Sequence, residues 1–219
     1  MKQAILTKMI DGGVVAVVRK IDRDKVMQVI EAIVDGGISG IEITLDSDGA
    51  LDVIREANLA FKGQAVVGAG TVLDAQSANM AIHAGAEFIF SPTMNTETIL
   101  TANRYGKIVI PGVFTPTEIL QAQQAGADLV KIFPASVLGP TFIKDVKGPL
   151  AHVNMMPTGG VSLSNTAEYI RAGAAAVGVG GSLLQKDLIA EKRYSELQSL
   201  AKQYCDEVQK GRHALVNSN

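Results

Sequence analysis

One stretch sets the pattern of the chain: Ala125-Gly126-Ala127-Asp128-Leu129-Val130-Lys131-Ile132-Phe133-Pro134. A glycine junction closes a helix-like segment, and an apolar run rich in β-branched and aromatic residues follows and stops at the proline. Such a run is typical of a short buried β-strand. Similar junctions recur at Ala84-Gly85-Ala86-Glu87 and Ala172-Gly173-Ala174-Ala175, with a variant at Asp35-Gly36-Gly37-Ile38. The sequence therefore predicts a repeated unit in which a helix ends and a strand begins.

Apolar runs and amphipathic helical stretches alternate along the whole sequence. The runs are apolar on both faces, which is typical of a parallel sheet covered by helices. The expected strands are 14–19, 40–44, 65–71, 87–92, 107–112, 128–134, 152–157 and 175–180. The expected helices are 22–35, 48–61, 74–84, 96–104, one from 115, a short turn at 141–146, 164–171 and 188–210, which Gly211 ends.

Eight such units in 219 residues predict an α/β fold. We expect a (β/α)8 TIM barrel that forms a single domain over residues 1–219, with an N-terminal helix and a C-terminal helix. An open doubly wound sheet is the alternative. It is disfavoured because no G-x-G-x-x-G motif follows the first strand.

Composition narrows the classes of partner. The net charge is −2 and no long run carries one sign, so neither nucleic acid nor an anionic membrane surface is expected. No long apolar run predicts a membrane span. Cys205 is the only cysteine, which excludes a disulfide within the chain and favours a cytoplasmic location. The three histidines share no ligand spacing, so no metal and no cofactor are expected.

Lys131 does not fit a buried strand. A lysine among apolar residues must reach water, pair with a counter-charge or lose its proton. Loss of the proton leaves a neutral amine, the form that makes Schiff bases with carbonyl compounds. The alternative is a structural lysine that reaches water from the strand end or pairs with Asp128.

Glu42 shows the same anomaly with the opposite charge, because it lies between Ile41 and Ile43. Side chains alternate along a strand, and the site of a barrel lies at the carboxyl ends of its strands. If Lys131 points into the barrel, we expect Glu42 to do so too. A buried lysine–glutamate couple suits proton transfer, and a purely structural pair is the alternative.

Two glycine loops follow the last two predicted strands, Thr158-Gly159-Gly160 and Gly180-Gly181-Ser182. Glycine lets backbone N–H groups approach an anion, and the loops after strands seven and eight commonly bind phosphate in such barrels. Tight turns without a ligand are the alternative. The other candidates at strand ends are Arg19, Thr44, Thr71, Pro92 and Phe133.

Several longer motifs resemble one enzyme family. They are Val66-Val67-Gly68-Ala69-Gly70-Thr71-Val72, Phe90-Ser91-Pro92, Ile110-Pro111-Gly112-Val113-Phe114-Thr115-Pro116-Thr117-Glu118, Val130-Lys131-Ile132-Phe133-Pro134-Ala135 and Pro157-Thr158-Gly159-Gly160-Val161. In order and spacing they are similar to the 2-keto-3-deoxy-6-phosphogluconate (KDPG) aldolases, also described as 4-hydroxy-2-oxoglutarate (KHG) aldolases. The likeness extends from about Val14 to Leu184.

The resemblance implies a homotrimeric class I aldolase that works without a metal. It implies Lys131 as the Schiff-base lysine and Glu42 as the acid/base group. The implied substrate contacts are Thr71 and Pro92 at the pyruvate end, Phe133 beside the lysine, Thr158 near the substrate, and Gly159, Gly160, Gly180, Gly181 and Ser182 at the phosphate, with Arg19 close to that end.

One position departs from the family pattern. Some members carry an arginine four residues after the glutamate, where it helps to hold the pyruvate carboxylate, and this chain has Asp46 there. Three arrangements stay open: Thr71 and backbone donors hold the carboxylate alone, Asp46 turns outward, or Asp46 binds a substrate hydroxyl.

The resemblance implies cleavage of the phosphorylated keto acid KDPG to pyruvate and glyceraldehyde 3-phosphate, and also of KHG to pyruvate and glyoxylate. The same chemistry on the 6-phosphogalactonate epimer is an alternative. A phosphate-binding isomerase or epimerase and a sugar-phosphate-binding protein are the others.

Overall fold

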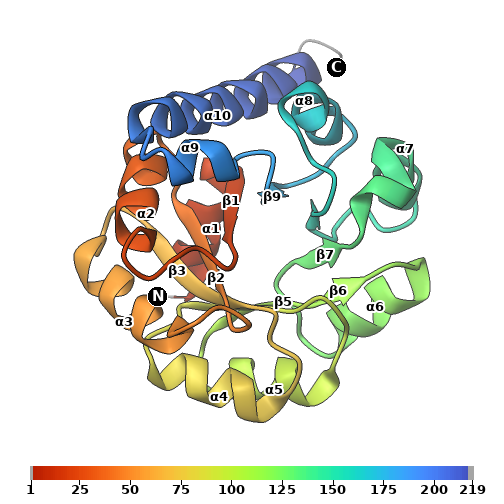
Figure 1. Ribbon diagram of the computed structural model, residues 1–219. Coiled ribbons are helices and arrows are strands. Elements are labelled where there is room, and N and C mark those ends of the chain that lie inside the picture. The colour runs from red at the N-terminus through yellow and green to blue at the C-terminus, as the bar shows by residue number, and fades with distance from the viewer. Residues whose placement is uncertain (1, 217–219) are drawn as a thin grey trace.

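The computed structural model describes residues 2–216, in which strands alternate with helices (Figure 1). The strands are β1 Val14–Val18, β2 Gly40–Thr44, β3 Val66–Gly70, β4 Phe88–Phe90, β5 Ile108–Ile110, β6 Gly112–Val113, β7 Val130–Ile132, β8 Met155–Pro157 and β9 Val177–Val179. The helices are α1 Lys2–Gly12, α2 Val26–Asp35, α3 Ala50–Ala60, α4 Ala75–His83, α5 Thr96–Arg104, α6 Pro116–Gln124, α7 Ala135–Lys147, α8 Leu163–Arg171, α9 Lys186–Ala190 and α10 Tyr194–Val216. Met1 and residues 217–219 of the predicted domain lie outside the described residues.

The strands form two parallel sheets. One has the order β5-β4-β3-β2-β1-β9 and the other the order β6-β7-β8. Strands that run in the same direction need crossover connections, and the helices supply them. In Figure 1 helices surround the strands, which lie near the centre. The prediction of an α/β fold with a helix-covered parallel sheet is confirmed.

The two sheets adjoin at both edges. Pro111 separates β5 from β6, because a proline has no N–H to donate to a strand ladder. At the other edge Thr158 forms a parallel bridge with Gly178, and the Ala175 N–H donates to the Met155 carbonyl over 2.9 Å. The predicted fifth strand is thus two short strands, one in each sheet.

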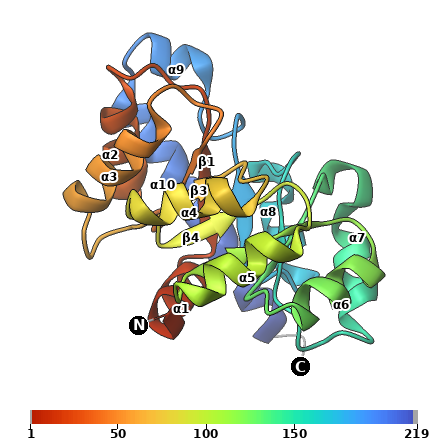
Figure 2. The same ribbon diagram turned by 90° about the horizontal axis from the view of Figure 1, so that it is seen from below.

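α1 lies at the amino-terminal ends of the strands, as Figure 2 shows. Its Leu6 and Met9 are buried in an apolar cluster with Val15 and Phe88. The Lys2 ammonium forms an ion pair of 3.0 Å with Asp128, which lies two residues before β7. The N-terminal helix is therefore present as predicted, and it covers the end of the strands opposite to the predicted site.

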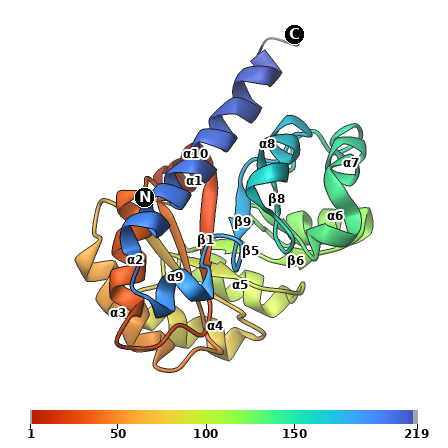
Figure 3. The same cartoon turned by 45° about the horizontal axis from the view of Figure 1, so that its top comes forward.

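The C-terminal helical segment differs from the prediction of one helix that Gly211 ends. It consists of α9 and α10, and α10 continues past Gly211 to Val216 (Figure 3). A Cβ at Gly211 would lie 2.7 Å from Ile170 Cβ and 2.8 Å from the Ala167 carbonyl oxygen, both on α8. The glycine therefore permits close packing of α10 on α8 and does not end a helix.

Two other helices also differ in extent. α2 begins at Val26, four residues after the predicted start at Asp22. α7 is longer than the predicted turn and contains a kink at Gly139, whose φ of 70° is not helical. The predicted starts of α4 and α6 are confirmed: Asp74 accepts a hydrogen bond from the Ser77 N–H, and Thr115 forms a capping box.

Candidate active site

Lys131 lies on β7, between β6 and β8, and only 4% of it is exposed. Its Nζ lies 4.2 Å from the ring centroid of Phe90 and 4.7 Å from that of Phe133. Burial lowers the pKa of the lysine, the nearby Glu42 carboxylate opposes this, and the charge of Arg19 lowers it further. The site thereby favours the neutral amine that nucleophilic attack requires.

Glu42 lies on β2 and is completely buried. Neither of its carboxyl oxygens has a hydrogen-bond partner among residues 2–216. Burial raises its pKa to about 7, against the opposing charges of Lys131 and Arg19 and with a small further rise from Asp46. A carboxyl with a pKa near neutrality and unused oxygens is suited to exchange protons with a ligand or a water molecule.

The backbone beside Glu42 makes room for its side chain. A Cβ at Gly70 of β3 would lie 1.7 Å from Glu42 Oε1, so the carboxyl occupies the space above this glycine. β2 and β3 pair in register from Gly40 with Val66 to Thr44 with Gly70. The Glu42 carboxyl and the Lys131 amine are close enough for each to shift the pKa of the other.

Arg19 follows β1 and connects the ends of three neighbouring strands. Its Nη2 donates to Thr71 Oγ1 over 2.8 Å, and its Nη1 donates to Asp46 Oδ2 over 3.3 Å. Lys20 Nζ also lies 3.5 Å from the same Asp46 oxygen. Partial burial favours a higher pKa for Asp46, but a hydrogen bond from Thr44 and the charges of Arg19 and Lys20 together hold the pKa below its usual range. Asp46 is therefore an ion-pair partner of Arg19, an arrangement that the sequence did not predict.

A pocket of about 450 Å³ brings most of the predicted site residues together. Its lining includes Arg19, Lys131, Phe133, Thr158, Gly159, Gly160, Gly180, Gly181 and Ser182. Glu42 and Thr71 are not in this lining, but they are linked to it through Lys131 and Arg19. Pro92 lies at the end of β4, where its carbonyl group packs onto Gly112, the residue paired with Lys131.

The two glycine loops lie side by side at one end of this pocket. Gly159 and Gly160 have φ values of 85° and 84°, in the left-handed region that favours glycine. The N–H groups of Gly160 and Gly181 donate to no backbone acceptor within residues 2–216. Ser182 Oγ donates to the Val161 carbonyl over 2.6 Å and so joins the two loops. Such N–H groups can receive an anion.

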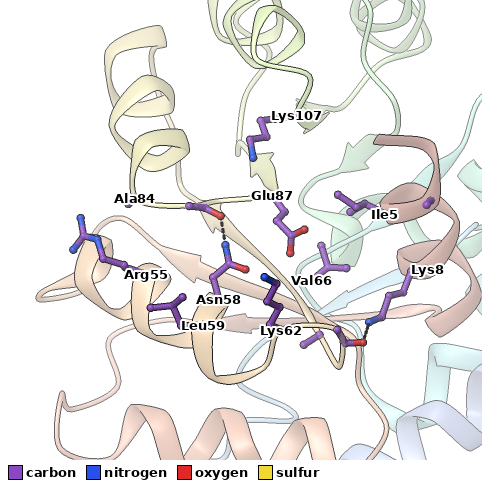
Figure 4. Close-up of a pocket in the computed structure, with 14 residues that line it drawn as sticks. Ile5, Lys8, Arg55, Asn58, Leu59, Lys62, Val66, Ala84, Glu87 and Lys107 are labelled. Atoms are coloured by element: carbon purple, nitrogen blue, oxygen red, sulfur yellow. Dashed lines mark hydrogen bonds between the residues drawn. The ribbon is translucent and has the colours of Figure 1, made fainter. Parts of the chain in front are cut away.

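A second pocket, of about 600 Å³, lies at the opposite, amino-terminal end of the strands (Figure 4). Lys8, Arg55, Lys62 and Lys107 line it together with Glu87, and Lys8 Nζ donates to the Gly63 carbonyl over 2.7 Å. Each of these five ionisable side chains is at least partly exposed. The buried lysine and the buried carboxyl lie at the other end, so the reactive chemistry is assigned to the first pocket.

A sequence profile of the family described as KDPG and KHG aldolase matches residues 5–200. The chain belongs to this aldolase family. Members of the family are lyases, and the buried lysine is the feature that a Schiff-base member needs.

Named relatives agree with the family profile. A 2-dehydro-3-deoxy-6-phosphogalactonate aldolase of Escherichia coli is 36% identical over 151 residues, which is 68% of this chain and 74% of that protein. A 2-dehydro-3-deoxy-phosphogluconate aldolase of Haemophilus influenzae is 32% identical over 206 residues, 93% of this chain and 96% of that protein.

A solved aldolase structure is similar in fold. It is the KDPG aldolase of Legionella pneumophila, with pyruvate captured at low pH as a covalent carbinolamine intermediate. The TM-score is 0.83 at 26% identity, with 90% of this chain and 96% of that chain covered. Among residues 2–216 of the present aldolase, no three His, Cys, Asp or Glu side chains gather as a metal site, and no helix is long and apolar enough to cross a membrane.

Sequence reasoning missed three site residues of this aldolase. Phe90 contacts the Lys131 ammonium, and its place two residues before Pro92 on the same strand face was a usable signal. Gly70 makes room for Glu42, and Gly178 makes room for Thr158, whose Oγ1 would lie 2.3 Å from an added Cβ. No local pattern in the sequence identifies these two glycines, because the need for them arises on a neighbouring strand.

Proposed function

We propose that this protein is a class I aldolase that cleaves KDPG to pyruvate and glyceraldehyde 3-phosphate, and that it also cleaves KHG to pyruvate and glyoxylate. The observation that carries the proposal is the buried Lys131 amine, whose pKa is lowered, near the buried Glu42 carboxyl, for which residues 2–216 supply no hydrogen-bond partner. Membership of the aldolase family and the names of its relatives support the same reaction.

Lys131 acts as the nucleophile. Its neutral amine attacks the C2 ketone to give a carbinolamine. The Glu42 carboxyl then donates a proton to the departing hydroxyl group, which leaves as water, and a protonated imine and the Glu42 carboxylate remain. Burial of the Lys131 side chain favours the neutral amine before attack, because little water reaches Nζ to solvate an ammonium ion. The rings of Phe90 and Phe133, whose centroids lie 4.2 Å and 4.7 Å from Nζ, interact favourably with the positive charge once it forms on the imine nitrogen.

Glu42 moves the protons. As a carboxylate it accepts the proton of the C4 hydroxyl while the electrons of the C3–C4 bond flow into the imine, and glyceraldehyde 3-phosphate leaves. The enamine then takes a proton at C3, and water hydrolyses the imine to release pyruvate and the free amine. A pKa of about 7 allows the same group to donate and accept protons near neutral pH.

The loops of Gly159, Gly160, Gly180, Gly181 and Ser182 bind the phosphate in this proposal. Their N–H groups and the pocket of about 450 Å³ support this role. Fixing the phosphate holds C2 beside the lysine, which lowers the entropic cost of reaction. Thr158 and Pro92 complete the contacts near the reacting carbons.

The 6-phosphogalactonate epimer is the second candidate substrate, because the Escherichia coli relative is named for it. The two acids differ only in the configuration at C4. Turnover of both epimers and of the unphosphorylated KHG by the same preparation identifies the preferred substrate, as the ratio of their kcat/KM values.

The architecture is part of the proposal. We infer that the two sheets close into one (β/α)8 barrel over a single domain; the continuous chain through Pro111 and the bridge between Thr158 and Gly178 support this. A homotrimer is proposed from the family resemblance. A cytoplasmic location is proposed from the single, unbridged Cys205.

Borohydride trapping tests the reaction. Incubation with pyruvate and borohydride should reduce the imine to a stable adduct on Lys131, and Lys131→Met should abolish it. Lys147 is an internal control, because burial also lowers its pKa while the Ala151 and Val153 carbonyls hold its ammonium. An adduct on Lys147 alone, or phosphate binding without any adduct, would contradict the aldolase and favour an isomerase, an epimerase or a binding protein.

A further inference from the structure

The pocket at the amino-terminal ends of the strands takes no part in the proposed reaction (Figure 4). We call it the amino-terminal pocket. Its volume of about 600 Å³ lies within the usual range of small-molecule sites, which is about 300–1,000 Å³. Three walls form it: α1, α3 with the turn that follows, and the starts of β3, β4 and β5, where Val66, Glu87 and Lys107 line it.

The two helices contribute apolar side chains to this pocket. Arg55, Asn58 and Leu59 are spaced i, i+3 and i+4 on α3, so they lie on one side of the helix. Leu59 lines the pocket together with Ile5 of α1, and 73% of Leu59 is exposed. These apolar side chains are therefore available to contact the carbon skeleton of a ligand.

Three charged groups of the pocket have no partner in the described part of the chain. In Figure 4 the side chains of Lys62, Lys107 and Glu87 point into the same space. Among residues 2–216 none of the three forms an ion pair or a side-chain hydrogen bond. At the same end of the strands, by contrast, Lys2 pairs with Asp128 over 3.0 Å. Convergent polar groups without partners, beside an apolar lining, are typical of a small-molecule site.

Lys8 adds a third ammonium group to this pocket. Its Nζ donates to the Gly63 carbonyl over 2.7 Å, which leaves two of its three N–H donors for a ligand. Arg55 contributes less, because it pairs with Asp52 over 2.6 Å and points outward in Figure 4. Three ammonium groups and one carboxylate give the pocket a net charge of +2, although the chain as a whole carries −2.

We propose that the amino-terminal pocket binds a phosphate monoester whose carbon skeleton is partly apolar. Such an ester carries a charge of about −1.5 to −2 at pH 7, which balances the charge of the pocket. Its phosphate oxygens accept from Lys8, Lys62 and Lys107, and its skeleton lies against Ile5 and Leu59. The site is separate from the substrate phosphate loops, because those loops follow the opposite, carboxyl ends of the strands.

Calorimetric titration with phenyl phosphate and with inorganic phosphate tests the proposal. The titrated protein is the full chain with Gly181→Asp, because a carboxylate at the substrate loops repels phosphate there and leaves the second site to be measured. We expect phenyl phosphate to bind once per chain with a Kd of about 1 mM or lower. Inorganic phosphate should bind at least about threefold more weakly, because it makes no apolar contact.

Four substitutions in the Gly181→Asp chain assign the charges. Lys62→Gln and Lys107→Gln should each raise the Kd of phenyl phosphate about fivefold, because each removes a charge-assisted contact. Glu87→Gln should lower the Kd about threefold, because it removes a charge that repels phosphate. Lys202→Gln is the matched control and should leave the Kd unchanged, since Lys202 pairs with Asp206 on α10, outside the pocket.

Four results overturn the inference. Without saturable binding of phenyl phosphate to the Gly181→Asp chain, there is no second site. If Lys62→Gln and Lys107→Gln act no more strongly than Lys202→Gln, phosphate responds only to the net charge of the protein. If Glu87→Gln raises the Kd, the carboxylate holds a cationic group of the ligand. If inorganic phosphate binds as tightly as phenyl phosphate, the apolar side chains do not select the ligand.

Discussion

Replacement of Gly70 by alanine tests whether the inner space of β3 is reserved for the Glu42 carboxyl. The added Cβ would lie 1.7 Å from Oε1 and 2.4 Å from both Cδ and Cγ of Glu42. Ordinary contacts begin at 3.4 Å, so Oε1 must move by roughly 1.7 Å or β3 must shift. Glu42 is completely buried, which leaves it no exposed direction in which to turn.

Overpacking of this kind typically costs about 1–3 kcal/mol of unfolding free energy. A displacement of more than 1 Å at a reacting group commonly reduces the rate by about a hundredfold. We therefore expect Gly70→Ala to lower kcat for KDPG cleavage by about a hundredfold. Binding at the phosphate loops should change little, because those loops follow β8 and β9.

Urea unfolding in a double-mutant cycle assigns the cost. Glu42→Ala empties the space above Gly70, so Gly70→Ala in that background should cost less by about 1–2 kcal/mol than in the wild type. An equal cost in both backgrounds would refute the reasoning, because the clash would then not involve Glu42. Wild-type kcat in Gly70→Ala would likewise refute the role of this glycine in placing the carboxyl.

Three further predictions concern charge, the phosphate loops and helix packing. Burial raises the pKa of Glu42 from 4.5 to about 7. Between these pH values the folded protein keeps the Glu42 proton, whereas the unfolded chain has lost it. We therefore expect the contribution of Glu42 to the unfolding free energy to fall as the pH rises from about 4.5 to 7. Gly181→Asp should raise the KM of phosphorylated substrate at least about tenfold, because a carboxylate beside the loops repels phosphate. Gly211→Ala should lower the unfolding free energy by about 1–3 kcal/mol, although alanine favours helices, because its Cβ would meet Ile170 and the Ala167 carbonyl.

Each of these predictions has a direct control. Urea unfolding of Glu42→Gln between pH 4 and 8 should lack the part of the slope that Glu42 supplies, and an unchanged slope would contradict the shifted pKa. Pyruvate trapping should be normal in Gly181→Asp, and Gly181→Ala should be mild because no atom lies within 4 Å of the added Cβ. A higher melting temperature of Gly211→Ala would show that helix propensity outweighs the close packing of α10 on α8.

Much of the fold was predictable because its signals are local. Short apolar runs between glycine junctions gave the strands, and the caps at Asp74 and Thr115 gave two helix starts. The errors have a common cause in tertiary packing. Glycine is a residue type that often ends a helix, but at Gly211 the α8 helix packs closely against the backbone and α10 continues. Pro111 divides the predicted fifth strand because a strand ladder needs an N–H at that position, which proline lacks. That need comes from the pairing with a neighbouring strand and not from the residues next to Pro111 in the sequence.

The sequence by itself determined which residues are anomalous. Lys131 and Glu42 stand out because a charged side chain in an apolar strand must be paired, neutral or in contact with a ligand, and strand alternation alone places each on a definite face. Only the tertiary structure decided their environment. It buries the carboxyl over Gly70, places the amine against two rings, and turns Arg19 toward Thr71 and Asp46. These contacts join strands far apart in sequence, and the distances that set pKa and charge balance exist only once the strands have assembled.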